Sequence, residues 1–376
     1  MKNIFPIFLI FVLFSSCCIT KTDDYGKRFS GDGTSAAPYL IYNKADFMAV
    51  CGGDDTINKY YHLEADLVDE DTITEPLGGE NNGFYGYFDG NGHTINLNIQ
   101  GNYKDAGLFA HIGTFIVNTG KRQYGTVKNL KLTGLIDVDG DDYVRAGSLA
   151  AVAAYPGSSI SNIASSVKVI ARGANSIAVG GITGVLNNVV VSHCYSTGDL
   201  IASNQDQTFV VFGGGIAGIG QESSIRYCWS SGSVLIGNNK KTYIGGILGG
   251  GAEILTNCVA LNEKISGSPV DGMSFGTHRI TTRIFLEPDT ILANNYANNS
   301  MIIDNGLNWG SDVELHDSDS VGDDKIHGAS VSLDEVESSN GMWWKITAGW
   351  LDYFGNNENN PWKWDNVIKR PVLWFE

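Results

Sequence analysis

The chain has 376 residues, 47 of them glycine, and its 41 acidic residues outnumber 25 basic residues to give a formal net charge of −16. Such a surface repels nucleic acid and anionic lipid, and no run of Lys or Arg offsets it, so neither is an expected partner. At this length a compact fold would divide into two domains, whereas an elongated repeat structure forms one.

The N-terminus has the pattern of an export signal. Lys2 precedes an apolar run from Ile4 to Phe14, and two serines then lead to Cys17. The apolar run is too short to span a bilayer, so it is not a transmembrane helix. The order resembles a lipoprotein signal, although Phe14 stands where such signals usually carry Leu. We therefore expect a signal peptide over residues 1–16.

Cleavage before Cys17 would leave a lipidated tether over residues 17–30. The acidic pair Asp23 and Asp24 resembles the tether associated with surface export in such lipoproteins. Several acyl chains anchor a protein durably, since each buried CH₂ contributes about 0.8 kcal/mol. We expect an outer-membrane protein that faces the cell exterior and touches the membrane only through its lipid. An ordinary secretory signal cut near Cys18 is the alternative, and it also exports the protein.

Two acidic segments precede the main repeats. Asp89 and His93 lie in FDGNGHTI, where Gly and Asn favour turn chemistry over catalysis. Further on, DVDGDD has the alternation of a calcium loop, but its glycine falls at position four and no glutamate closes the loop. We interpret this segment as a solvated turn. The weaker alternative is a metal site at Asp137, Asp139 and Asp141, and no other cofactor is predicted.

A glycine-rich block recurs three times between Gly180 and Ile265. The copies read GGITGVLNNVVVSHCYSTGDL, GGIAGIGQESSIRYCWSSGSV and GGILGGGAEILTNCVALNEKI. Their leading isoleucines lie 34 and 31 residues apart, a spacing typical of a solenoid. Looser copies extend toward the N-terminus, one of them after an insertion. When the copies are aligned, one position in each is occupied by an apolar residue or cysteine, and we call it the rung position. Its members are Leu130, Ile163, Cys194, Cys228 and Cys258.

Positions further along each copy continue the pattern. Residues two positions apart lie on the same face of a strand. The residues two positions after the rung position are therefore expected to stack as a second ladder. Its members are Leu132, Ser165, Ser196, Ser230 and Ala260. After two more residues, Gly and Asn predict a left-handed turn, with Val167 as the exception. That series is Gly134, Val167, Gly198, Gly232 and Asn262.

The residue types favour strands over helices. The segments are short, alternate in polarity, favour Val, Ile and Thr, and are separated by Gly, Asn and Ser. We predict an all-β fold, a right-handed parallel β-helix over residues 31–265 with roughly 20 to 35 residues per coil. The three cysteines of the rung are expected to be core thiols, with Cys51 standing alone, because no CxxC or His cluster suggests zinc.

Residues 266–376 are predicted to form the final coils and a Trp-rich cap. An acidic stretch from Asp312 to Asp324 has no ordered spacing and is interpreted as an excursion loop. A solenoid needs its open end covered, and six tryptophans in the last 34 residues are suited to that role. The alternative is that Trp362 and Trp364 are exposed and stack on sugar rings.

Several segments carry a family resemblance. The blocks GGITGVL…VSHCYSTGDL and GGGIAGIG…IRYCWSSGSV resemble the GLUG motif. GDGTSAAPYLIYNKADFMAV and FYGYFDGNGHTINLNI resemble the opening segments of Bacteroides-type β-helical lipoproteins, and NNYANNSMIIDNG and WKWDNVIKRPVLWFE resemble their C-terminal segments. The resemblance implies a β-helical architecture and a role in surface adhesion or glycan contact, without an assigned activity.

We therefore expect a monomeric surface lipoprotein that binds an extracellular glycan or a host or matrix protein without catalysis. One rival is a polysaccharide lyase or glycoside hydrolase, which needs paired carboxylates or an acidic cluster beside a base. A second rival is a structural component of a surface assembly, which predicts an exposed apolar patch or strand edge.

Overall fold

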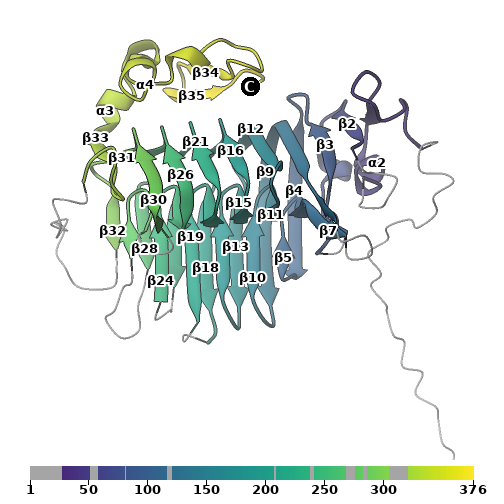
Figure 1. Ribbon diagram of the computed structural model, residues 1–376, viewed down its shortest axis with the longest axis horizontal. Coiled ribbons are helices and arrows are strands. Elements are labelled where there is room, and N and C mark those ends of the chain that lie inside the picture. The colour runs from purple at the N-terminus through teal and green to yellow at the C-terminus, as the bar shows by residue number, and fades with distance from the viewer. Residues whose placement is uncertain are drawn as a thin grey trace, which may run out of the picture.

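The protein is an elongated parallel β-solenoid (Figure 1). This computed structural model describes residues 28–50, 58–80, 82–116, 121–206, 209–237, 241–267, 276–282, 286–304 and 321–376. Residues 1–16, Cys17, Cys51 and most of the 312–324 stretch lie outside the described residues. The predicted all-β solenoid architecture is confirmed.

Three parallel sheets run along the solenoid, and its central coils contribute strands to all three. The longest sheet has 20 strands: β1 (Tyr39–Ile41), β2 (Tyr60–Leu63), β3 (Gly86–Asp89), β4 (Thr94–Asn102), β9 (Gly125–Gly140), β12 (Ser159–Ser165), β13 (Lys168–Gly173), β16 (Val190–Ser192), β17 (Tyr195–Ser196), β18 (Leu200–Asn204), β21 (Ser224–Arg226), β22 (Trp229–Ser230), β23 (Val234–Gly237), β26 (Ala252–Thr256), β27 (Val259–Ala260), β28 (Lys264–Gly267), β30 (Leu286–Ala293), β31 (Tyr296–Asn298), β32 (Ile302–Asp304) and β33 (Ala329–Val331).

The other two sheets complete the central coils. The six-stranded sheet holds β5 (Asp105–Ala106), β10 (Val144–Gly147), β14 (Ile177–Gly180), β19 (Val210–Gly214), β24 (Lys241–Gly245) and β29 (Thr277–His278). The five-stranded sheet holds β6 (Phe109–Ile112), β11 (Ala150–Ala154), β15 (Thr183–Asn187), β20 (Ala217–Gln221) and β25 (Leu248–Gly250). The predicted insertion contains a hairpin of β7 (Thr114–Ile116) and β8 (Lys121–Gln123).

Short helices lie outside the coils. Helix α2 (Lys44–Met48) starts at Asn43, whose side chain accepts a hydrogen bond from the Asp46 N–H, and it places Phe47 in the core. The others are η2 (Asp69–Asp71), α3 (Leu333–Val336), η4 (Ser339–Gly341), α4 (Met342–Ile346) and η5 (Leu351–Tyr353). Within the described part of the chain, none of the helices has the length and apolar character needed to cross a bilayer.

The strand register confirms both predicted ladders. Ser165 pairs with Leu132 on one side and with Ser196 on the other, and the series continues through Ser230 to Ala260. The rung position, two residues earlier, holds Cys194, Cys228 and Cys258, all free and buried in the core. Burial raises the pKa of the Cys194 and Cys258 thiols well above its usual value. All three thiols are 0% exposed, which confirms the expectation that they are core groups.

The predicted left-handed turn lies elsewhere in the coil. Of its predicted members, Gly134 has a left-handed φ of 105°, but Gly198 and Gly232 do not. A Cβ on Gly232 would lie 2.0 Å from the Gly198 carbonyl oxygen, so glycine is needed there because stacked coils approach closely. The left-handed residue instead directly precedes the rung position, with φ between 53° and 56°, in Asn129, Asn162, His193, Tyr227 and Asn257.

The glycine pair that opens each repeat has a steric cause as well. A Cβ on Gly215 would lie 2.1 Å from the carbonyl oxygen of Gly246 in the next coil. A Cβ on Gly181 would meet the Gly215 carbonyl oxygen at the same distance. The repeat therefore marks a corner where successive coils touch backbone to backbone, and any side chain would separate them.

The aromatic C-terminal segment lies along the side of the solenoid. Residues 333–376, which we call the C-terminal strap, include β34 (Trp362–Asp365) and the antiparallel β35 (Arg370–Leu373). The strap crosses the ends of strands from β31 toward β12 (Figure 1). Its tryptophans pack on outward-facing Tyr195, Trp229 and Val259, each one residue past the rung position. The predicted aromatic cluster is present, but it covers these apolar side chains rather than the open end.

Candidate functional site

A pocket of about 390 Å³ lies on the outer face of the first coils. We call it the tyrosine groove. Polar and aromatic side chains of four successive coil segments line it, a composition typical of sites that hold polar organic ligands. The lining residues are Ser35, Pro38, Tyr60, Tyr61, His62, Tyr87, Phe88, Asp89, Thr126 and Lys128.

Strand alternation places these side chains on the outer face. In β2, Tyr61 and Leu63 point into the core, so Tyr60 and His62 point outward. In the same way, Phe88 of β3 is buried between its outward neighbours. The parallel register then aligns two outward rows, which run Tyr60, Tyr87, Thr126 and His62, Asp89, Lys128.

The first row is aromatic. The rings of Tyr60 and Tyr87 are stacked, with centroids 4.2 Å apart and an interplanar angle of 8°. Tyr124, which follows the β7–β8 hairpin, packs edge-on against Tyr87, and their hydroxyl oxygens lie 3.2 Å apart. The hydrogen bond to Tyr124 raises the pKa of Tyr87. The Tyr87 hydroxyl is therefore protonated at neutral pH and can donate or accept a hydrogen bond.

The second row is charged and hydrogen-bonded. The Asp89 Oδ2 atom lies 3.1 Å from Lys128 Nζ and 3.5 Å from His62 Nε2. Its Oδ1 atom accepts hydrogen bonds from the Asn91 N–H at 2.8 Å and from Asn129 Nδ2 at 3.0 Å. The turn role predicted for Asp89 is thus present, but the same carboxylate also lines the groove.

The other residue of that turn, His93, does not line the groove. Its Nδ1 atom lies 3.0 Å from Asp66 Oδ1, which also accepts the Thr94 N–H at 2.8 Å. This arrangement holds the start of β4 in place. His93 therefore agrees with the structural role expected from the sequence.

The structure separates the two tryptophans proposed to stack on sugars. Trp362 is 0% exposed and packs against Trp350, with centroids 4.9 Å apart, so the prediction of an exposed platform is wrong for this residue. Trp364 is half-buried, and its ring lies over Gly341. Lys363, between them, donates to the carbonyl oxygen of Glu376 at 2.7 Å. This part of the strap serves mainly to hold the C-terminus on the solenoid.

The acidic run on β9 is occupied by protein partners. Arg172 donates to Asp137 at 2.7 Å and to Asp139 at 3.3 Å, while Asp141 accepts from Asn102 at 3.1 Å. The first two residues lie on a strand, which corrects the expectation of a solvated turn. Over the described ranges, no group of three or more His, Cys, Asp or Glu side chains is placed to hold a metal ion.

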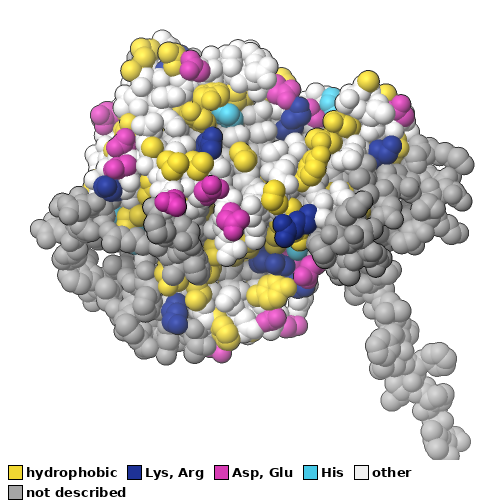
Figure 2. Space-filling model, viewed as in Figure 1, with side chains coloured by type: hydrophobic (Ala, Val, Ile, Leu, Met, Phe, Trp, Pro, Cys, Tyr) yellow, Lys and Arg dark blue, Asp and Glu magenta, His cyan; other side chains and the backbone are white. Residues whose placement is uncertain are grey.

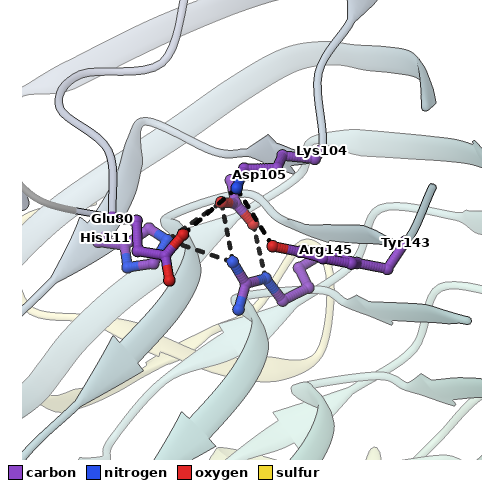
Figure 3. Close-up of polar contacts among 6 residues, drawn as sticks. All are labelled: Glu80, Lys104, Asp105, His111, Tyr143 and Arg145. Carbon is purple, nitrogen blue, oxygen red and sulfur yellow. Dashed lines mark hydrogen bonds and ion pairs between the residues drawn. The ribbon is translucent and has the colours of Figure 1, made fainter. Parts of the chain in front are cut away.

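A second polar cluster lies on the five- and six-stranded sheets (Figure 3). Buried Asp105 accepts two hydrogen bonds from Arg145, at 2.6 and 2.9 Å, and lies 3.1 Å from His111. Burial opposes ionisation of Asp105, but the hydrogen bonds from His111 and Arg145 outweigh it and lower its pKa. Lys104 and Tyr143 pack beside this network. Its charges are matched internally, so it stabilises the fold.

Surface charge is mixed outside these clusters. Figure 2 shows one face of the molecule, on which acidic and basic side chains are interspersed rather than gathered into a patch of one sign. The described surface in this view therefore offers no extended basic face for a polyanion.

Of the comparisons with known proteins, the one with solved structures bears on architecture. No protein-family model matches the chain. It is 33% identical over 124 residues to halomucin of Haloquadratum walsbyi, a match that spans 29% of this chain and only 1% of halomucin. A crystal structure described as a "putative immunoglobulin A1 protease" from Bacteroides ovatus superposes with a TM-score of 0.60 at 20% identity, covering 92% of this chain and 95% of that one. At this identity the likeness shows a shared β-solenoid fold alone.

Proposed function

We propose that this protein binds an extracellular glycan through the tyrosine groove and performs no catalysis. The observation that carries the proposal is the stacked Tyr60–Tyr87 pair beside a row of hydrogen-bonding side chains. Aromatic rings pack against the CH-rich faces of sugars, while their hydroxyls and the neighbouring polar groups bind sugar hydroxyls.

The shape of the groove fits an extended chain. Its two rows cross successive coils, so a ligand lying in it would run along the solenoid axis. Four strands about 4.8 Å apart span about 14 Å, the length of a short oligosaccharide segment. A polysaccharide could therefore occupy the groove with a few sugars and continue beyond it on either side.

The proposed cellular location rests on the N-terminal sequence. We propose that Cys17 is lipidated and anchors the chain to the outer membrane, with the solenoid facing the cell exterior and the protein acting as a monomer. The GLUG-like repeats and the lipoprotein-like order of the N-terminal residues support this proposal. A host or matrix protein that carries suitable glycans would be an equally suitable partner.

Affinity electrophoresis tests the proposal. The mature protein is run through native gels that contain host or dietary polysaccharides, and each gel is then stained for residual polymer. We expect retardation with intact polymer, reduced in the double variant Y60A/Y87A. Clearing of polymer along the protein track would instead indicate a glycan-degrading enzyme. An absence of retardation in every gel would count against glycan binding.

A further inference from the structure

The tyrosine groove contains one lysine, and that lysine is already paired twice. Of the residues that line the groove, Lys128 alone is Lys or Arg. Its ammonium lies 3.1 Å from Asp89 and forms a second ion pair with Glu358. Burial lowers the pKa of a lysine, but the bond to Glu358 and the charge of Asp89 outweigh it and raise the Lys128 pKa. Lys128 is thus charged at neutral pH, and the carboxylates of Asp89 and Glu358 neutralise its charge.

Glu358 reaches the groove from the far end of the sequence. It belongs to the C-terminal strap, between η5 and β34, and its carbonyl oxygen accepts a hydrogen bond from Asn162 Nδ2 at 3.4 Å. The Asn357 side chain orders the same turn by accepting the N–H groups of Asn359 and Asn360, each at 3.0 Å. The strap therefore holds the Glu358 carboxylate beside Lys128.

The charges around the groove favour one class of ligand. Glu64 lies 3.4 Å from His62, so carboxylates flank the charged row at its His62 end and at its Lys128 end. An acidic sugar would have to compete with Glu358 for the Lys128 ammonium, and it would meet the charge of Asp89 there. Like charges a few ångströms apart near a protein surface repel by a few kcal/mol. A neutral sugar meets no such cost.

We propose that Glu358 is a specificity-determining residue that occupies Lys128 and restricts the tyrosine groove to neutral glycans. This inference rests on the proposed glycan-binding function. It gives the strap a second role, because the segment that covers the aromatic side of the solenoid also completes the groove.

The test compares polymers that differ only in charge. Soluble starch, galactomannan and xyloglucan are each cast in native gels beside the same polymer oxidised at its primary hydroxyls to uronate. The mature wild-type protein is run with E358Q, which removes the charge with little change of shape. E253Q is the control, because Glu253 is an exposed glutamate outside the groove and the variant has the same net charge.

We expect the wild-type protein and E253Q to be retarded by at least one neutral polymer and not by its oxidised form. E358Q should keep its affinity for the neutral polymer and bind the oxidised form about tenfold more tightly than wild type does. Strong binding of oxidised polymers by the wild type, or unchanged discrimination in E358Q, would overturn the inference while leaving glycan binding intact. Retardation by none of the six polymers would count against the proposed function itself, and the inference would fall with it.

Discussion

Trp350 donates its indole N–H to the carbonyl oxygen of Asn257 at 3.0 Å, although 93 residues separate them. The Asn257 side chain in turn donates to the carbonyl oxygen of Ala348 at 3.1 Å. Asn257 is one of the left-handed residues that precede the rung position, so the strap is bonded directly to a turn of the solenoid. The strap is therefore an integral part of the fold.

Replacing Trp350 with Ala should destabilise the protein strongly. The side chain is fully buried, and its removal leaves a large cavity and breaks the bond to Asn257. We expect a loss of about 3–5 kcal/mol in the free energy of unfolding, measured by denaturant titration. V367A is the control, because Val367 is 89% exposed on the same strap. Equal stability of the two variants would mean that the strap is not docked as described.

A glycine pair tests the close contact between coils. G215A should cost about 2 kcal/mol, because the new Cβ would lie 2.1 Å from a backbone oxygen that cannot move independently. G237A should leave the melting temperature nearly unchanged, since no heavy atom lies within 4 Å of its new Cβ. Thermal melts of both variants make the comparison, and a tolerated Gly215 substitution would contradict the described corner.

The cysteine ladder predicts a clear contrast between core and surface. C228D places an unpaired charge in a fully buried position and should cost about 3 kcal/mol or more, enough to unfold much of the array. D141N changes an exposed side chain and should leave melting nearly unchanged. Circular dichroism of both proteins decides the matter. A mild effect at Cys228 would show that the inward face has been assigned wrongly.

His193 should make stability depend on pH. Its ring packs against the rings of Tyr227 and Tyr353, at centroid distances of 5.3 and 4.6 Å, and burial lowers its pKa. The unfolded chain therefore binds the proton more readily than the folded protein does. Stability from neutral His193 is present above about pH 6.5 and declines as the pH falls below that value.

The variant H193N isolates this effect. Asn occupies the same left-handed position in neighbouring coils, so the backbone should be retained without the titrating ring. Melting temperatures recorded from pH 7.5 to 5 should fall less steeply in H193N than in the wild type. Identical slopes would rule out His193 as a source of the pH dependence.

The solenoid was predictable because its core repeats. The spacing of Cys194, Cys228 and Cys258 defines which residues stack, and the register follows from it. The side-chain type alone did not reveal that Gly198 and Gly232 serve close packing, because glycine suits both a left-handed turn and a backbone contact. Only the positions of neighbouring coils distinguish the two.

The tyrosine groove could not be predicted in the same way. Its residues come from early coils of unequal length, outside the glycine-rich repeats, so no fixed spacing relates Tyr60 to Tyr87. Buried Tyr61 and Leu63 do indicate that Tyr60 and His62 face outward, but not which residues lie beside them.

The contact between Glu358 and the groove was equally hidden. It depends on where the strap folds, and that is determined by outward aromatic side chains on distant coils. One signal was present in the sequence. Tyr195 and Trp229 each directly follow a rung cysteine, so they face outward as large apolar side chains that another segment must cover.

Single tyrosine variants test the tyrosine groove through their affinity for an oligosaccharide derived from whichever polymer retards the wild type, measured by isothermal titration calorimetry. Y60A should bind at least tenfold more weakly than wild type, equivalent to about 1.4 kcal/mol. Y42A should bind like wild type, because Tyr42 is 50% exposed and does not line the groove. Unchanged affinity in a folded Y60A protein would contradict the assignment of the tyrosine groove as the glycan-binding site.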